Sequence, residues 1–76
     1  MPRLESSADV EHWLTSELGA TFARRGNHGK LFHRECPNCG RLLRITVPIN
    51  RSPIAKDTLS SIYRQCHLRP DGSPRC

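Results

Sequence analysis

The stretch RLLRITVP, residues 41–48, decides the fold, because apolar and polar residues alternate along most of its length. Three apolar side chains fall on one side of an extended chain: Leu43, Ile45 and Val47. Arg44 and Thr46 fall on the other side, and Pro48 closes the run. The pattern predicts a strand with one buried face and one basic face. We therefore expect a sheet that is packed against a core on one face.

Two further strands are expected before this one. ATFARR, residues 20–25, and GKLFHR, residues 29–34, have strand-compatible compositions, and a Gly26-Asn27 turn signal separates them. CPNCG, residues 36–40, has the proline and glycine of a tight turn. Three consecutive strands with such short links predict an antiparallel meander.

Amphipathic helices are expected in the chain before the first strand and after the third strand. In the first, four apolar residues share one face: Val10, Trp13, Leu14 and Leu18. Ser6 and Asp9 fit a capping box, and Gly19 ends the helix. Asp57 is expected to cap the second helix, whose apolar residues also share one face: Leu59, Ile62, Tyr63 and Cys66. The sequence predicts an α+β fold, in the order α-β-β-β-α, with both helices on one face of the sheet.

The chain length allows one small domain. Of the 76 residues, 1–68 form the expected domain, and 69–76 form a turn-rich tail. A core of this size supplies about 3–5 kcal/mol, so a staple such as a metal is expected. No apolar run approaches the roughly 20 residues of a membrane helix, and the polar N-terminus resembles no leader. We expect a cytoplasmic protein, in which cysteines are thiols or metal ligands rather than disulfides.

The basic residues are concentrated in the middle of the chain. The net charge is +5, and residues 24–51 hold seven arginines and lysines against a single acid, Glu35. A localised positive field of this kind predicts a polyanionic partner, either nucleic acid or an acidic protein. The alternative is a solvated basic surface on a small domain.

The CPNCG turn has the form of a zinc knuckle, which supplies half of a metal site. The second strand and the second helix should end at the same pole, and the tail could fold back there. We expect a structural zinc site, which the tail 69–76 closes, with these thiolate ligands: Cys36, Cys39, Cys66 and Cys76. His67 is the alternative ligand. Two other interpretations remain open, in which Cys66 is a small core residue and Cys76 a terminal thiol.

Three motifs, in this order, resemble the HicA toxins, which are small mRNA interferases of toxin–antitoxin pairs. They are GNH at residues 26–28, RITVP at 44–48 and TLSSIYRQCHL at 58–68. The resemblance implies a double-stranded-RNA-binding-domain-like fold, RNA cleavage by the motif histidine, and a HicB-like antitoxin that covers the active surface. Asn27 and the Cys66-His67 pair depart from the family pattern, which has Ser or Thr, and Ala-Gly, at these places.

His28 is the expected catalytic residue. Gly26 and Gly29 allow a sharp turn around it, and histidine exchanges protons near neutral pH. Cleavage through the 2′-hydroxyl needs no metal and confines the substrate to RNA. Five basic residues are expected to bind that RNA: Arg24, Arg25, Lys30, Arg44 and Lys56. The structural alternative for His28 is a turn histidine, and His33 is expected to be a cross-strand surface residue.

The sequence therefore predicts the toxin of a type II toxin–antitoxin system. It would be a metal-independent endoribonuclease that acts on mRNA and is neutralised by a HicB-like antitoxin. The alternative is a non-catalytic RNA- or protein-binding module with a structural zinc site. A zinc-ribbon-like adaptor without a nucleic-acid role is a third interpretation. A redox role for the C-x-x-C pair is disfavoured, because no β-α-β pattern surrounds it.

Overall fold

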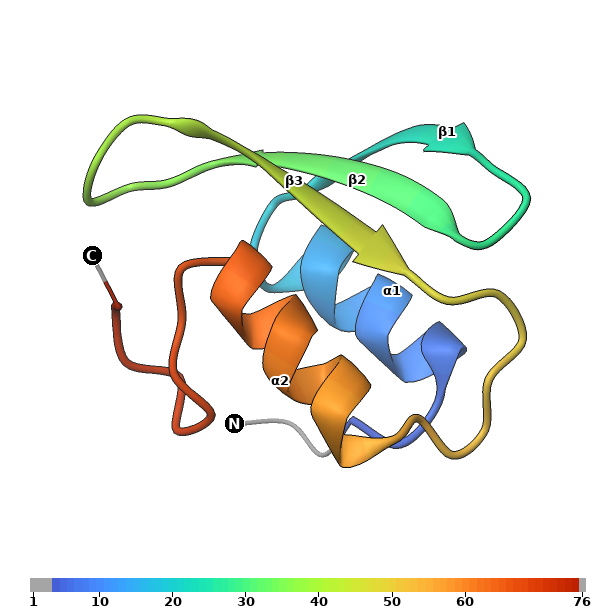
Figure 1. The fold of residues 1–76 in the computed structure, drawn as a ribbon. Coiled ribbons are helices and arrows are strands. Elements are labelled where there is room, and N and C mark those ends of the chain that lie inside the picture. Colours follow the sequence, from blue (N-terminus) through green and yellow to red (C-terminus); the bar gives the residue numbers. More distant parts are fainter. Residues whose placement is uncertain (1–3, 76) are drawn as a thin grey trace.

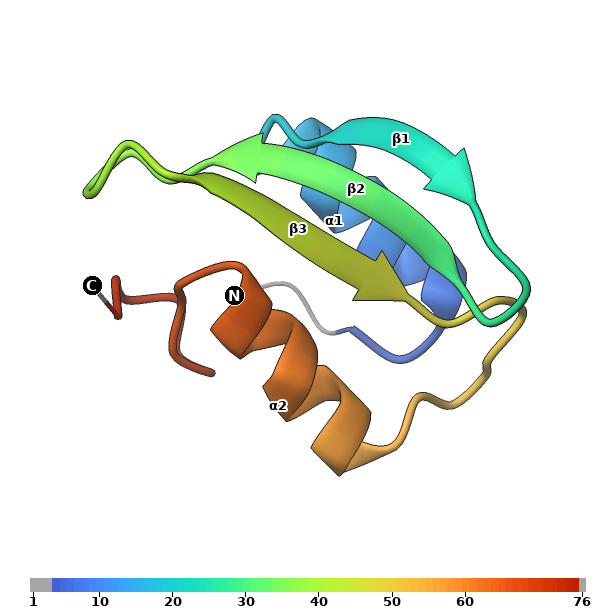
Figure 2. The ribbon, with the colours of Figure 1, turned by 45° about the horizontal axis from the view of Figure 1, so that its top comes forward.

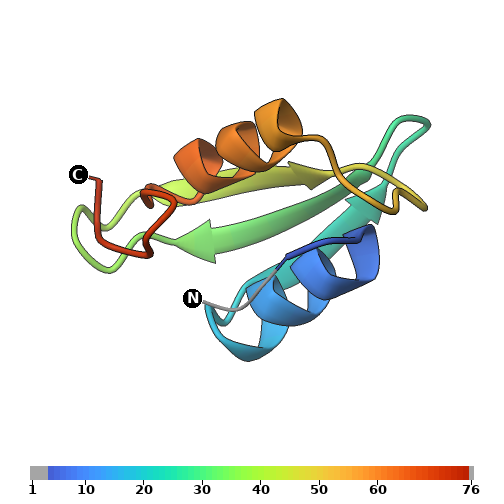
Figure 3. The same ribbon diagram turned by 90° about the horizontal axis from the view of Figure 1, so that it is seen from below.

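A computed structural model describes residues 4–75 of the chain. The elements are α1 (Ser7–Ser16), β1 (Thr21–Arg25), β2 (Lys30–Glu35), β3 (Leu42–Val47) and α2 (Lys56–Gln65). The strands form one antiparallel sheet in the order β1-β2-β3. Both helices lie against the same face of this sheet, and its other face is open (Figure 1; Figure 3). The expected α-β-β-β-α architecture is thereby confirmed.

The strand register places the apolar residues on the helix-covered face. Leu43, Ile45 and Val47 are buried, and Phe32 of β2 lies opposite Ile45. The next pair in the ladder, His33 and Arg44, lies on the open face because side chains alternate along a strand. The prediction of a strand with one buried face and one exposed face is thereby confirmed.

The start of α1 is fixed by the expected capping box. The Ser6 hydroxyl accepts a hydrogen bond from the Asp9 amide, and the Asp9 carboxylate accepts one from the Ser6 amide, each at 3.2 Å. Val10, Trp13 and Leu14 are buried on the face toward the sheet. The helix ends at Ser16, with Glu17 as its C-cap, so Leu18 lies beyond the helix and the end is earlier than predicted. The backbone then turns at Gly19, where φ is 67°.

The start of α2 differs from the prediction. Its N-cap is Ala55, without a side-chain cap, so Asp57 lies inside the first turn. The reason lies in the preceding loop, where Ile54 is buried and its amide donates to the Glu5 carbonyl at 2.8 Å. This tertiary contact fixes the helix start, and Asp57 remains favourable there because of the helix dipole.

The far end of α2 covers the open edge of β3. The Gln65 side-chain carbonyl accepts a hydrogen bond from the Thr46 amide at 2.8 Å. An unpaired strand edge exposes such amides, so this bond protects part of the edge. Arg34 of β2 donates to the Cys66 carbonyl at 3.2 Å and so ties the helix end to the sheet. Neither helix of the described chain is long and apolar enough to cross a membrane.

Candidate functional site

Cys36, Cys39 and His67 form a group that could hold a metal ion. Their ligand atoms all lie within 4.8 Å of one another, and the Cys39 sulfur is 3.5 Å from Nδ1 of His67. The cysteines belong to the turn between β2 and β3, and His67 follows α2. Figure 2 shows this turn and the end of α2 at the same end of the molecule.

The cysteine turn is held by its own backbone. The Cys36 amide donates to the Arg41 carbonyl, and the Gly40 amide donates to the Cys36 carbonyl, each at 2.8 Å. Gly40 has φ of 70°, which glycine adopts without a side-chain penalty. The turn keeps Cys36 buried and Cys39 exposed, so the pair lies at the surface of the domain.

His67 occupies the position just after α2 where glycine is usual. Its amide donates to the Arg64 carbonyl at 3.0 Å, and the Leu68 amide donates to the Tyr63 carbonyl at 2.9 Å. These two bonds define a Schellman motif, whose central residue has a left-handed backbone. At His67 φ is 57°, which costs a side-chain-bearing residue about 1–2 kcal/mol. Strain of this kind is concentrated at functional sites, which favours a role for this imidazole.

The donor set suits zinc. Two thiolates and one imidazole are common zinc ligands, with bonds of about 2.3 Å to sulfur and 2.0–2.1 Å to nitrogen. On a tetrahedral ion, a sulfur and a nitrogen at these bond lengths lie about 3.6 Å apart. The 3.5 Å separation of Cys39 and His67 agrees with this value. The Cys36 sulfur lies within 4.8 Å of both atoms, so the three residues could supply three ligands to one ion.

The structure brings the cysteine turn to His67, the alternative ligand, and leaves Cys66 outside the group. Cys66 is 1% exposed and lies in the hydrophobic core. Burial raises the pKa of its thiol to about 11, although the charge of Arg34 opposes this shift. A thiol in this setting stays protonated near neutral pH, whereas zinc binds thiolates. The fourth expected ligand, Cys76, lies outside the described residues.

His28, the expected catalytic residue, is exposed at the tip of the β1–β2 turn. The Gly26 amide donates to the Gly29 carbonyl at 2.8 Å and closes the turn around it. Within residues 4–75, the His28 side chain makes no hydrogen bond or ion pair. The imidazole is therefore accessible to a ligand from solvent.

The five expected RNA-binding residues have different surroundings. Arg24 and Arg25 are exposed at the end of β1, and Arg44 is exposed on the open face of the sheet. The ammonium of Lys30 instead pairs with Glu11 of α1 at 2.8 Å. Lys56 is exposed at the start of α2, which the loop after β3 separates from the β1–β2 turn (Figure 2), and no hydrogen bond within the described chain links it to His28.

His33 lies across the strands from Thr21 and Arg44, in the cross-strand position expected for it. It is less exposed than a surface residue, and its Nε2 atom is buried without a hydrogen-bond partner in the described chain. Strand alternation predicts the face but gives no sign of this burial.

Comparisons with known proteins assign no family to this chain. No family model, no curated protein and no solved structure matches it. The resemblance to the HicA toxins therefore stays a prediction from the sequence.

Proposed function

We propose that this chain cleaves RNA, with His28 as the proton-transferring residue. The observation that supports this most is the position of His28, exposed at the tip of a turn closed by Gly26 and Gly29. An RNA strand can reach such a side chain from solvent without rearrangement of the core. The proposal requires no metal in the chemical step.

A single histidine suffices for the first proton transfer. The imidazole takes the proton of a 2′-hydroxyl, and the resulting oxygen attacks the neighbouring phosphorus. The P–O bond to the 5′ oxygen then breaks, which leaves a 2′,3′-cyclic phosphate, and the 5′ oxygen takes its proton from the imidazolium or from water. General acid–base catalysis of this kind contributes roughly 10²–10⁴-fold. Because DNA lacks the 2′-hydroxyl, it would not be cleaved.

Exposed arginines near the turn support binding of the phosphates. Arg24 and Arg25 directly precede Gly26 in the chain, and Arg44 adds charge to the open sheet face. Arginine binds phosphate oxygens through a planar fork of N–H groups. Lys56, at the start of α2, would contribute a further charge. Lys30 contributes less to this proposal because its ammonium pairs with Glu11.

The resemblance to the HicA toxins extends the proposal to a toxin of a type II toxin–antitoxin system. Its substrate would be mRNA, its place of action the cytoplasm, and its inhibitor a HicB-like protein that covers the His28 end. Expression of the wild-type chain would then arrest growth, and the His28→Ala chain would not. Co-expression of the antitoxin encoded beside it would relieve the arrest.

The metal centre would have a structural role in this proposal. A zinc ion held by Cys36, Cys39 and His67 would connect the β2–β3 turn to the end of α2. A small domain gains from such a staple because its core is limited. Cys76 is the expected fourth ligand, and Cys76→Ser would then weaken zinc binding measured by competition with a chelating dye.

One observation favours a second candidate function. Within residues 4–75, no side chain forms a hydrogen bond with His28 and could act as its partner in proton transfer. A non-catalytic module that binds RNA or protein through its basic residues needs no such partner. The two candidates predict different results for RNA cleavage.

The deciding experiment is RNA cleavage in EDTA by the wild-type chain, His28→Ala and His12→Ala. His12 is an exposed histidine on α1 and serves as the matched control. We expect the wild type and His12→Ala to cleave equally and His28→Ala to be inactive. Binding of RNA without cleavage by all three proteins would support the binding module instead. Equal cleavage by all three would rule out His28 as the catalytic residue.

A further inference from the structure

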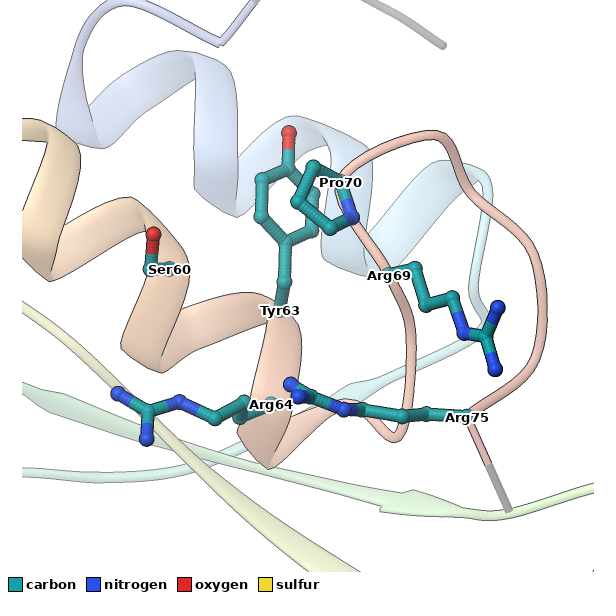
Figure 4. Close-up of a pocket in the computed structure, with 6 residues that line it drawn as sticks. All are labelled: Ser60, Tyr63, Arg64, Arg69, Pro70 and Arg75. Atoms are coloured by element: carbon teal, nitrogen blue, oxygen red, sulfur yellow. The ribbon is translucent and has the colours of Figure 1, made fainter.

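A basic pocket lies where the C-terminal tail folds back against α2 (Figure 4). Its volume is about 610 Å³, and six residues line it: Ser60, Tyr63, Arg64, Arg69, Pro70 and Arg75. Three of the six are arginines, and none is acidic. The sequence analysis did not predict this pocket, because it assigned no regular structure to the tail.

The arginines come from two parts of the chain that the fold holds together. Arg64 lies in the last turn of α2, whereas Arg69 and Arg75 lie in the tail (Figure 4). The Arg69 amide donates to the Ser73 carbonyl, and the Arg75 amide donates to the His67 carbonyl, each at 2.9 Å. These bonds give the tail a defined course, so the pocket has a fixed backbone frame.

The described part of the chain balances the three guanidinium charges only in part. Hydrogen bonds from Ser73 and the charge of Arg69 lower the pKa of the Asp71 carboxyl, so Arg69 interacts with an acid in the same tail. Within residues 4–75, none of them forms an ion pair with a carboxylate. Asp71 is the acid in the same tail, and its Oδ1 accepts hydrogen bonds from the Ser73 amide at 2.9 Å and the Ser73 hydroxyl at 2.6 Å. Figure 4 shows the Arg64 and Arg69 side chains pointing in opposite directions, so the positive charges are spread along the rim of the pocket, where an extended polyanion could contact them in turn.

The geometry points to a phosphate-binding site for RNA, formed by Arg64, Arg69 and Arg75. Arginine forks match phosphate oxygens, and such contacts dominate the affinity of proteins for nucleic acids. Tyr63 and Pro70 add an apolar wall on which a base or sugar can pack. The Tyr63 ring is itself held by an edge-to-face contact with Trp13 at 5.6 Å between centroids. This wall favours a nucleotide over an acidic protein segment.

This inference rests on the proposed function, because it takes RNA as the ligand. It adds a second binding site, which lies away from the catalytic turn. The pocket is bounded by α2 and the tail, whereas His28 lies at the tip of the β1–β2 turn. A substrate that contacts both would be longer than the two nucleotides whose bond is cleaved. RNA chains too short to reach the pocket would be cleaved less efficiently.

The test is binding of a labelled 12-nucleotide 2′-O-methyl oligouridylate, which the proposed chemistry cannot cleave. Fluorescence anisotropy compares the wild type with Arg69→Gln/Arg75→Gln and with Arg41→Gln/Arg51→Gln. The control pair removes the same charge from two exposed arginines outside the pocket. Thermal unfolding checks that both variants are folded, and Arg64→Gln tests the pocket from the helix side.

We expect the pocket variant to bind at least roughly tenfold more weakly than the control variant, since it loses two charge-assisted contacts. For the pocket variant, the slope of log K against log salt concentration should be smaller in magnitude by about 1.4. This difference corresponds to the loss of two contacts with single-strand phosphates. Equal losses in the pocket and control variants would overturn the inference. Tighter binding of poly-glutamate than of the RNA would also overturn it. Loss of cleavage in His28→Ala is measured separately, so failure of the catalytic proposal would not be mistaken for failure of this one.

Discussion

Cys39 and His67 lie 28 residues apart in the chain, yet the sulfur of the first is 3.5 Å from Nδ1 of the second. The fold creates this contact by bringing the β2–β3 turn to the end of α2. A metal ion there would add a link between two segments that already meet through the core residues Cys36 and Cys66 and through the bond from Arg34 to the Cys66 carbonyl. Because His67 has a strained backbone, its contribution to stability should depend on the metal.

Replacing His67 by glycine separates the two effects of this position. Without metal, glycine adopts φ of 57° freely, so His67→Gly should stabilise the domain by about 1 kcal/mol. For a domain of this size the melting temperature should rise by about 4–8 °C. With zinc, the variant should gain less than the wild type, because a ligand is gone. Thermal unfolding of the wild type and of His67→Gly, in chelator and in excess zinc, measures the effect of the backbone strain and the effect of the lost ligand.

Cys39→Ser is the matched control for that experiment. It removes a ligand from the turn and leaves the backbone of the helix end unchanged. The melting temperature of Cys39→Ser should therefore not rise with zinc, and in chelator it should not exceed that of the wild type. If zinc raised the melting temperature of all three proteins equally, the group would not be the metal site.

The cysteines should differ in their reactivity toward a maleimide. Cys39 is exposed, whereas Cys66 is 1% exposed and its pKa is raised to about 11 by burial. In chelator, Cys39 should be labelled in the native protein and Cys66 only after unfolding. Zinc should slow the labelling of Cys39, because a coordinated thiolate is a poorer nucleophile. Mass spectrometry of peptides identifies the labelled residue, and fast labelling of Cys66 in the native state would contradict its placement in the core.

The sheet could be predicted from sequence because its signal is local. Leu43, Ile45 and Val47 alternate with polar residues, and a period of two is recognisable in a single short segment. The capping box of α1 is local in the same way. The start of α2 is not, because burial of Ile54 and its bond to Glu5 depend on two distant segments meeting.

Only part of the metal group could be predicted from the sequence, because the roles of Cys66 and His67 depend on the tertiary fold. Cys66 continues the helical stripe of Ile62 and Leu59, which indicates a core residue as strongly as its thiol indicates a ligand. His67 comes directly after the end of α2. The left-handed backbone that brings it to Cys39 cannot be predicted from the residue type. The Lys30–Glu11 pair likewise joins residues 19 apart, through packing of α1 on the sheet.

Asp9 should make the stability of α1 depend on pH. Hydrogen bonds from the backbone amides of Glu5 and Ser6 lower the pKa of its carboxyl below 3.8. A lowered folded pKa means that the carboxylate stabilises the fold above the unfolded pKa, and that this contribution disappears as pH falls through the folded value. Asp9→Asn should therefore reduce the loss of stability on acidification. Urea unfolding from about pH 5 to about pH 2 measures this, and parallel curves for the two proteins would contradict it.

Gly29 should be irreplaceable in the turn that carries His28. A Cβ atom at this position would lie 2.7 Å from the Val47 carbonyl oxygen, which is backbone and cannot rotate away. Gly29→Ala must therefore push the β1–β2 turn away from the end of β3, at a cost of roughly 1–3 kcal/mol, as for other overpacked sites. Gly26→Ala is the control, because its Cβ would meet the Gly29 carbonyl at an ordinary 3.5 Å.

Urea unfolding measures the stability of both glycine variants, and RNA cleavage by the folded fraction measures the position of His28. We expect Gly29→Ala to lose activity at temperatures where it is still folded, because reacting groups must be placed to within about 1 Å. Gly26→Ala should keep most of its activity and stability. If both variants stayed fully active, the position of this turn would not matter for cleavage, and the catalytic proposal for His28 would lose its main structural support.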